Sequence, residues 1–81
     1  MEMTIRNTKD FGEIVRLARI KKNFRQVDLA RRASVRQALI SELENGAVSA
    51  KLDTVIKVLS ALDLDLSVVV RRKARFDPTD Y

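Results

Sequence analysis

The chain of 81 residues contains no cysteine, no histidine and no tryptophan, and it has one proline and two glycines. The absence of cysteine and histidine removes disulfides, thiolate nucleophiles, most transition-metal ligands and the usual general base. The acidic residues are scattered singly, and no glycine-rich phosphate loop is present. We therefore expect no catalytic residue, no metal site and no cofactor, and an enzyme is the least favoured class of function.

No uninterrupted apolar run is long enough to cross a bilayer, and the amino end lacks an apolar stretch followed by small residues. We expect a cytoplasmic protein without a membrane partner. The length allows one small domain whose core is marginal by itself, which favours additional stabilisation by a partner subunit.

Basic residues outnumber acidic ones, and the excess is concentrated in the first half of the chain. Sixteen Lys and Arg against eleven Asp and Glu give a net charge of +5. From Arg16 to Arg36 there are eight basic residues and one acidic residue, Asp28. Such a stretch favours a polyanion as partner. A membrane surface also attracts basic residues, but it favours long basic helices with tryptophan, so nucleic acid is preferred.

The spacing of apolar residues predicts short helices over most of the chain. The first helix is expected to be capped by Thr8 or Asp10 and to end near Lys22. Its apolar stripe consists of Phe11, Ile14, Val15 and Ala18. A later helix is expected after Ser49, a candidate cap. The predicted buried face of that helix consists of Leu52, Val55, Ile56, Leu59 and Leu62.

Residues 26–33 and 36–46 are two short amphipathic segments joined by Ser34-Val35, a connection so brief that it predicts a tight turn. Two short helices joined in this way indicate a helix-turn-helix. The core side of the second helix is expected to consist of Leu39, Ile40 and Leu43. Gly46 is expected to end this helix, because a residue without a side chain enters the left-handed conformation at little cost.

A resemblance to the helix-turn-helix of the Cro/Xre family is carried by the pattern Phe24-x-Gln26-x-x-Leu29-Ala30, then Val35, then Gln37-x-x-Ile40-Ser41-x-Leu43-Glu44-x-Gly46. A further similarity, to HipB-type antitoxins within that family, is carried by Leu59-x-Ala61-Leu62-Asp63-Leu64-Asp65-Leu66 and the alternating apolar stretch after it. The resemblance implies a mainly α fold class. It implies a compact four- to five-helix Xre-type domain with a C-terminal β-strand that pairs across a dimer.

The resemblance also implies that Arg19 of the first helix pairs with Glu44 and ties the two helices together. Two surface charges that contribute almost nothing are the alternative. The chain departs from the family pattern at Arg25 and Arg36, because Ser or Thr usually caps these helix starts and an Arg side chain has no acceptor. The loss of each cap is worth about 1 kcal/mol. Ser34 is a further departure, since the turn usually contains glycine there.

The outer face of the second helix carries residues suited to double-stranded DNA. Gln37 can contact adenine through two hydrogen bonds, Ala38 can touch a thymine methyl group, and Arg36 can contact guanine or a phosphate. Ser41 is a secondary candidate for base contact. The residues expected to contact phosphates are Gln26, Arg25, Arg36 and Lys51. For one helix considered alone, a solvated polar face without function is the more common interpretation.

From Leu64 onward apolar residues alternate with a period of two, which predicts a strand. The expected dimerisation residues are Leu64, Leu66, Val68 and Val70. No other strand is evident to pair with it, so we expect it to pair with its own copy in a homodimer on a palindromic operator. The expected organisation is an N-terminal arm (1–7), a helix-turn-helix domain (8–63), a dimerisation strand (64–72) and a flexible tail (73–81).

These observations favour a DNA-binding repressor. The HipB likeness implies in addition an antitoxin that binds a HipA-like kinase toxin and autoregulates its operon. Phe76 and Tyr81 are candidate toxin contacts, because they are the large apolar residues of the tail. A stand-alone Xre-type repressor, phage-like or metabolic, with no toxin partner is the alternative.

Overall fold

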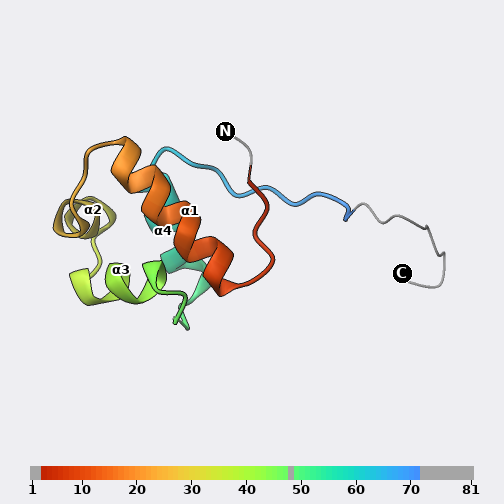
Figure 1. Ribbon diagram of the computed structural model, residues 1–81, viewed down its shortest axis with the longest axis horizontal. Coiled ribbons are helices and arrows are strands. Elements are labelled where there is room, and N and C mark those ends of the chain that lie inside the picture. The colour runs from red at the N-terminus through yellow and green to blue at the C-terminus, as the bar shows by residue number, and fades with distance from the viewer. Residues whose placement is uncertain (1–2, 48, 72–81) are drawn as a thin grey trace.

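The computed structural model of the chain describes residues 3–47 and 49–71. Its helices are α1 (Thr8–Lys21), α2 (Gln26–Ala33), α3 (Gln37–Glu44) and α4 (Leu52–Ala61). α1 packs on α3, and α2 packs on both α3 and α4. Figure 1 shows these helices gathered together, with an extended segment that leaves them after α4. The arrangement confirms the predicted mainly α class. None of the helices in the described residues is long and apolar enough to span a membrane.

The start of α1 differs from the prediction, because Asn7 rather than Thr8 or Asp10 caps the helix. The side-chain oxygen of Asn7 accepts a hydrogen bond of 2.8 Å from the backbone N–H of Asp10. The hydroxyl of Thr8 instead donates to the carbonyl oxygen of Gly46 at 2.9 Å. Thr8 therefore links the start of α1 to the chain that follows α3.

The core lies between the four helices and contains the apolar stripe predicted for α1. The buried residues of that stripe are Phe11, Ile14, Val15 and Ala18. α2 and α3 add Leu29, Ala30, Ala33, Ile40 and Leu43. Leu39, which was also expected to face the core, is partly buried against it. Helical periodicity therefore predicted most of the core correctly.

α1 and α3 are in close backbone contact at Gly12. This residue is buried, and a Cβ atom placed on it would lie 2.1 Å from the carbonyl oxygen of Leu43. Heavy atoms cannot approach so closely, and the obstacle is backbone rather than a flexible side chain. Glycine is therefore required where these two helices cross.

The turn between α2 and α3 closes without glycine. Ser34 adopts the left-handed conformation, with φ of 57°. The N–H of Val35 then donates to the carbonyl oxygen of Ala30 at 2.9 Å. The helix-turn-helix is thus formed with serine at the position where the family usually has glycine, at a conformational cost of roughly 1 kcal/mol.

The buried face of α4 is rotated relative to the predicted one. Leu52 and Ile56 are 62% and 46% exposed, whereas the sequence placed both in the core. The residues that do face the core are Val55, Val58, Leu59 and Leu62. Lys51, not Ser49, occupies the cap position. The apolar stripe of α4 is wider than the surface that the core of one chain covers, so one edge of it remains open.

The segment after α4 begins at Asp63, whose φ of 58° ends the helix and whose carboxylate lies 2.6 Å from Nζ of Lys22. Residues 64–71 then run as extended chain, and no strand is assigned among the residues that the structure describes. The predicted strand would pair with the same segment of a second copy of the chain, so the dimerisation strand stays a prediction. Its last residue and the tail, with Phe76 and Tyr81, lie outside the described residues.

Candidate nucleic-acid interface

α3 is divided into a buried face and a solvent face. The buried face consists of Ile40 and Leu43, neither of which has exposed surface. Outside this face Arg36, Gln37 and Ala38 are exposed, and Ser41 is partly buried. Ala38 lies opposite the buried residues, whereas Gln37, three positions before Ile40, lies beside them in the first turn of the helix. The small side chain of Ala38 leaves the backbone of the helix open to close approach. Three of the four predicted base-contact residues therefore lie on accessible surface, and Ser41 lies at its margin.

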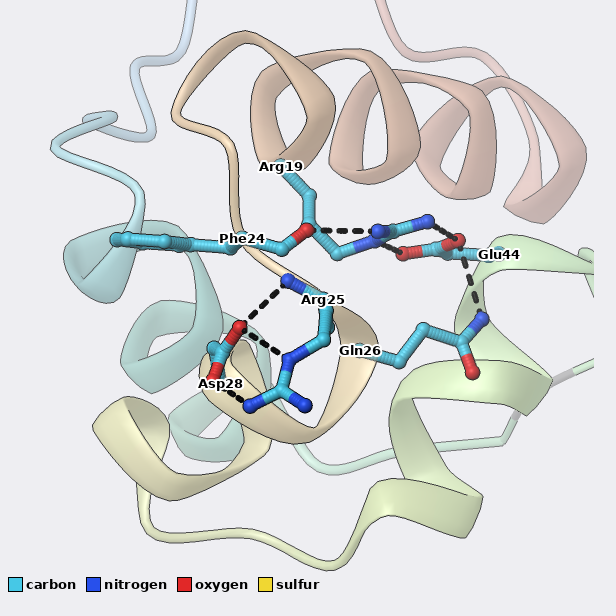
Figure 2. Close-up of polar contacts among 6 residues, drawn as sticks. All are labelled: Arg19, Phe24, Arg25, Gln26, Asp28 and Glu44. Carbon is cyan, nitrogen blue, oxygen red and sulfur yellow. Dashed lines mark hydrogen bonds and ion pairs between the residues drawn. The ribbon is translucent and has the colours of Figure 1, made fainter.

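A largely buried ion pair fixes the end of α3. Figure 2 shows Arg19 of α1 directed at Glu44, with hydrogen bonds from Nε to Oε2 at 2.6 Å and from Nη2 to Oε1 at 3.0 Å. Nη1 of Arg19 donates to the carbonyl oxygen of Phe24 at 2.8 Å. The side chains of the pair are 14% and 5% exposed. The hydrogen bonds with Glu44 raise the pKa of Arg19 above its usual value.

Gln26 contacts the same carboxylate. Its Nε2 donates to Oε1 of Glu44 at 3.3 Å, which holds the first turn of α2 against the last turn of α3 (Figure 2). The sequence predicts a phosphate contact for Gln26. The hydrogen bond with Glu44 fixes the position of the Gln26 amide, which is the group that would contact the phosphate.

Arg25, at the start of α2, folds back on Asp28. The Asp28 carboxylate accepts from the backbone N–H of Arg25 at 2.8 Å and from its Nε and Nη2 at 3.1 and 3.0 Å (Figure 2). These hydrogen bonds lower the pKa of Asp28 to about 2 and raise that of Arg25. In a capping box the third helical residue accepts from the backbone N–H of the cap residue, and the cap side chain accepts a bond in return. Asp28 forms the first of these bonds, whereas the Arg25 side chain has no acceptor for the second. The Arg25 side chain remains 76% exposed.

Three helices begin with a basic residue that does not cap them. These residues are Arg25 for α2, Arg36 for α3 and Lys51 for α4, and none makes a side-chain cap hydrogen bond. The N–H groups at a helix start carry partial positive charge and favour anions. The starts of α3 and α4 therefore combine a side-chain cation with backbone donors, an arrangement that suits a phosphate group. At the start of α2 the Asp28 carboxylate already takes the backbone N–H and part of the guanidinium of Arg25.

Part of the basic excess in the first half of the chain is used internally. Lys22 pairs with Asp63 at 2.6 Å, and the guanidinium of Arg32 lies 4.6 Å from the centre of the Phe24 ring. Two further arginines form the ion pairs described above. The charge available to a polyanion is consequently smaller than the count of basic residues in the sequence implies.

Glu42 is a residue of the outer face for which the sequence predicted no DNA contact. It is exposed and follows Ala38 by one helical turn, so the two share a face of α3. A carboxylate on such a face can accept a hydrogen bond from N4 of cytosine and disfavours a nearby phosphate. Its spacing from Ala38 is the sequence signal that could have indicated this role.

A family model described as Helix-turn-helix matches residues 15–69, which contain α2, α3, α4 and half of α1. The chain belongs to this helix-turn-helix family. The match confirms the resemblance to Cro/Xre-type domains. The chain is also similar to a curated relative, the uncharacterized HTH-type transcriptional regulator y4mF of Sinorhizobium fredii. The two are 32% identical over 75 residues, which cover 93% of this chain and 99% of the relative.

Solved structures of HipB have the same fold as this helix-turn-helix protein. A HipB variant in complex with an O2 20mer is 25% identical, with a TM-score of 0.79 over 89% of this chain and 100% of that chain. A chain of a HipA–HipB–O2–O3 complex is 25% identical, with a TM-score of 0.78 over 88% of this chain and 100% of that chain. The protein therefore has the fold of a DNA-binding transcriptional regulator and is structurally close to HipB.

Proposed function

We propose that the protein is a sequence-specific repressor that places α3 in the major groove of double-stranded DNA. The separation of α3 into a buried face and an exposed polar surface carries this proposal. Ile40 and Leu43 are buried and Glu44 is held by Arg19, while Gln37 is exposed in the first turn of the helix. A helix anchored on one side and polar on the other presents its side chains to base edges in a fixed orientation.

Each contact follows from the chemistry of one side chain. Gln37 pairs with adenine, Ala38 touches a thymine methyl group, and Glu42 accepts a hydrogen bond from cytosine. Arg36 contacts guanine or a phosphate, and Ser41 is a secondary base contact. The phosphate contacts that fix the register come from Arg25, Gln26 and Lys51. The basic starts of α2, α3 and α4 support this assignment.

The test begins with selection of bound duplexes from a randomised library. The affinity of Gln37→Ala is then measured for the selected duplex and for random duplex at one salt concentration. We expect a loss of roughly 1–3 kcal/mol on the selected duplex and little change on random DNA. Equal losses on both would remove Gln37 from the base contacts, and failure to enrich any sequence would overturn the proposal.

Lys51→Ala is the matched control for a phosphate contact. It is expected to weaken binding to both duplexes similarly and to reduce the dependence of affinity on salt. Lys51 is preferred to Arg25 for this purpose, because Arg25→Ala would also release Asp28 from its ion pair at the start of α2.

We infer that the repressor acts as a homodimer. Leu64 is partly buried, and the apolar residues that alternate after it, Leu66, Val68 and Val70, are exposed. A second copy offers the same residues and the same unpaired backbone groups. The dimer then presents its two α3 helices to the half-sites of a palindromic operator, about 34–36 Å apart or a multiple of that spacing.

We further propose that the protein is a HipB-like antitoxin that binds a HipA-like kinase toxin and represses its operon with it. The likeness to a chain of a HipA–HipB complex supports this assignment. Phe76 and Tyr81 of the tail are the candidate toxin contacts. Co-purification of the full chain with the products of adjacent genes tests it. A retained kinase-like protein supports the antitoxin, whereas an adjacent kinase-like protein that is not retained favours the stand-alone repressor.

A further inference from the structure

Asp28 lies in the first turn of α2 and binds the basic residue that precedes the helix. Its carboxylate accepts from Nε of Arg25 at 3.1 Å and from Nη2 at 3.0 Å (Figure 2). The backbone N–H of Arg25 donates to the same carboxylate at 2.8 Å. These hydrogen bonds lower the pKa of Asp28 to about 2, so the carboxylate is charged at neutral pH. The start of α2 therefore carries one charge of each sign.

The basic residues at the starts of α3 and α4 are not balanced in this way. Arg36 and Lys51 are exposed, and neither forms an ion pair within residues 3–47 and 49–71. Both present a free cation to a phosphate. Arg25 differs from them, because its charge already faces a carboxylate of the same chain.

We propose that Asp28 limits the affinity of the protein for the DNA backbone by balancing the charge of Arg25. The inference rests on the DNA binding of the proposed function and names a residue that tunes this binding without contact with a base. Arg25 still contacts a phosphate, but the carboxylate beside it reduces what this contact contributes.

The geometry allows Arg25 to remain bound to Asp28 while it contacts a phosphate. The Arg25 side chain is 76% exposed, and its Nη1 forms no hydrogen bond within the described part of the chain. Nη1 carries two N–H donors, and Nη2 keeps a second one after its bond to Asp28. A phosphate oxygen can therefore bind one side of the guanidinium while the carboxylate holds the other.

The carboxylate opposes this contact electrostatically. A phosphate on the outer side of the guanidinium lies within about one Debye length, roughly 8 Å at physiological salt, of the Asp28 carboxylate. The phosphate then meets a pair without net charge instead of a free cation. Because each phosphate that a cation neutralises releases counterions, the balanced pair releases fewer of them than a free arginine does.

Asp28→Asn tests the proposal, because it removes the charge and keeps an oxygen that can accept from the backbone N–H of Arg25. We expect a random duplex to bind roughly three- to tenfold more tightly at about 0.1 M salt. The slope of log affinity against log salt should steepen by about 0.9 per chain, the value for one further phosphate. Weaker binding than wild type, or an unchanged slope, would overturn the proposal.

Asp63→Asn is the matched control. Asp63 pairs with Lys22 at 2.6 Å, so this variant also releases a cation and raises the net charge by the same amount. Asn tolerates the left-handed conformation of this position, with φ of 58°. Neither residue is a proposed DNA contact, so we expect affinity within about twofold of wild type and an unchanged slope. Equal tightening in Asp63→Asn and Asp28→Asn would make net charge the cause and overturn the proposal.

Gln and Glu at position 28 separate charge from shape, since they differ in charge but hardly in size. Both occur at this position of a capping box, which supports the fold of each variant. Asp28→Gln is expected to show the steeper slope of Asp28→Asn, and Asp28→Glu the slope of wild type. The same slope in both would overturn the proposal, whatever the stability of Asp28→Asn.

Arg25→Ala distinguishes charge balance from positioning. It leaves the Asp28 carboxylate unbalanced beside the DNA, and we expect a random duplex to bind roughly three- to thirtyfold more weakly. The double variant with Asp28→Asn removes this repulsion and should bind within about threefold of wild type. If Asp28 only positioned Arg25 for its phosphate, the double variant would bind as weakly as Arg25→Ala, which would overturn the proposal.

The outcomes also separate this inference from the proposed function. Affinity for random duplex requires no knowledge of the operator, and circular dichroism confirms that each variant retains its helices. Enrichment of a bound sequence together with unchanged or weaker binding by Asp28→Asn would overturn the role of Asp28 and keep the repressor. A wild-type chain that binds no duplex even at low salt would overturn both.

Discussion

The α1–α3 contact and the region formed by α4 and the segment after it are built differently. Between α1 and α3, backbone meets backbone at Gly12, Arg19 binds Glu44 through two hydrogen bonds, and Thr8 donates to Gly46. In the other region, apolar side chains of both α4 and the extended segment lie open. The orientation of α3 is therefore set within one chain, whereas the apolar surface at α4 is the one that we propose a second copy completes.

Gly12→Ala is expected to have the largest effect on the α1–α3 contact. The added methyl group meets the carbonyl oxygen of Leu43, so the helices must move apart. We expect the free energy of unfolding to fall by about 3 kcal/mol or more, measured by urea denaturation. Glu13→Ala, at the next and exposed position of α1, is the control and should change stability little. A Gly12→Ala variant as stable as this control would refute the close approach.

The pair between Arg19 and Glu44 is expected to have the next largest effect. Glu44→Ala leaves the guanidinium without its main partner in a largely buried site, and we expect a loss of about 2–3 kcal/mol. A double-mutant cycle with Arg19→Ala should give a coupling energy above the roughly 0.2–1 kcal/mol of exposed pairs. Additive effects would mean that the two residues contribute independently.

A smaller effect is expected at the start of α2 when the pH is lowered. The pKa of Asp28 is about 2 in the folded chain, below its ordinary value of 3.8, so its ionised form stabilises the fold above that value. This contribution should be lost as the pH falls from about 4 towards 2. Urea midpoints at pH 6 and pH 3 should therefore differ less for Asp28→Asn than for wild type.

Asp53→Asn is the control for this pH effect, since Asp53 lies in the first turn of α4 and forms no ion pair among the described residues. The same reduction in both variants would show that the ion pair of Asp28 with Arg25 is not its cause.

Much of the fold follows from spacing in the sequence. Apolar residues repeat at helical intervals in α1 and α3, and the chain between α2 and α3 is too short for anything but a turn, so these elements were predicted correctly. The contact between Arg19 and Glu44 is different, because spacing does not connect residues 25 positions apart. Only the family resemblance indicated that contact, and the structure brings the two side chains together.

Other features depend on packing that no local pattern specifies. The apolar residues of α4 cover two neighbouring faces of the helix, and either face could be buried. Contact with α2 decides which face is buried. The prediction that Leu52 and Ile56 are buried was therefore wrong. Nothing in the sequence around Gly12 indicates that the backbone of α3 lies against it. Asn7 stands one position before Thr8 and three before Asp10, and all three side chains suit a cap, so the prediction placed the helix start one or three residues too late.

The most direct test of the division between the two regions is sedimentation equilibrium of the variant Leu66→Asp/Val68→Asp, with its helix content measured by circular dichroism. We predict a monomer that retains its helices, because the contacts between α1 and α3 lie within one chain. This monomer is expected to bind the operator much more weakly. A stable dimer in this variant would show that Leu66 and Val68 do not hold two copies together.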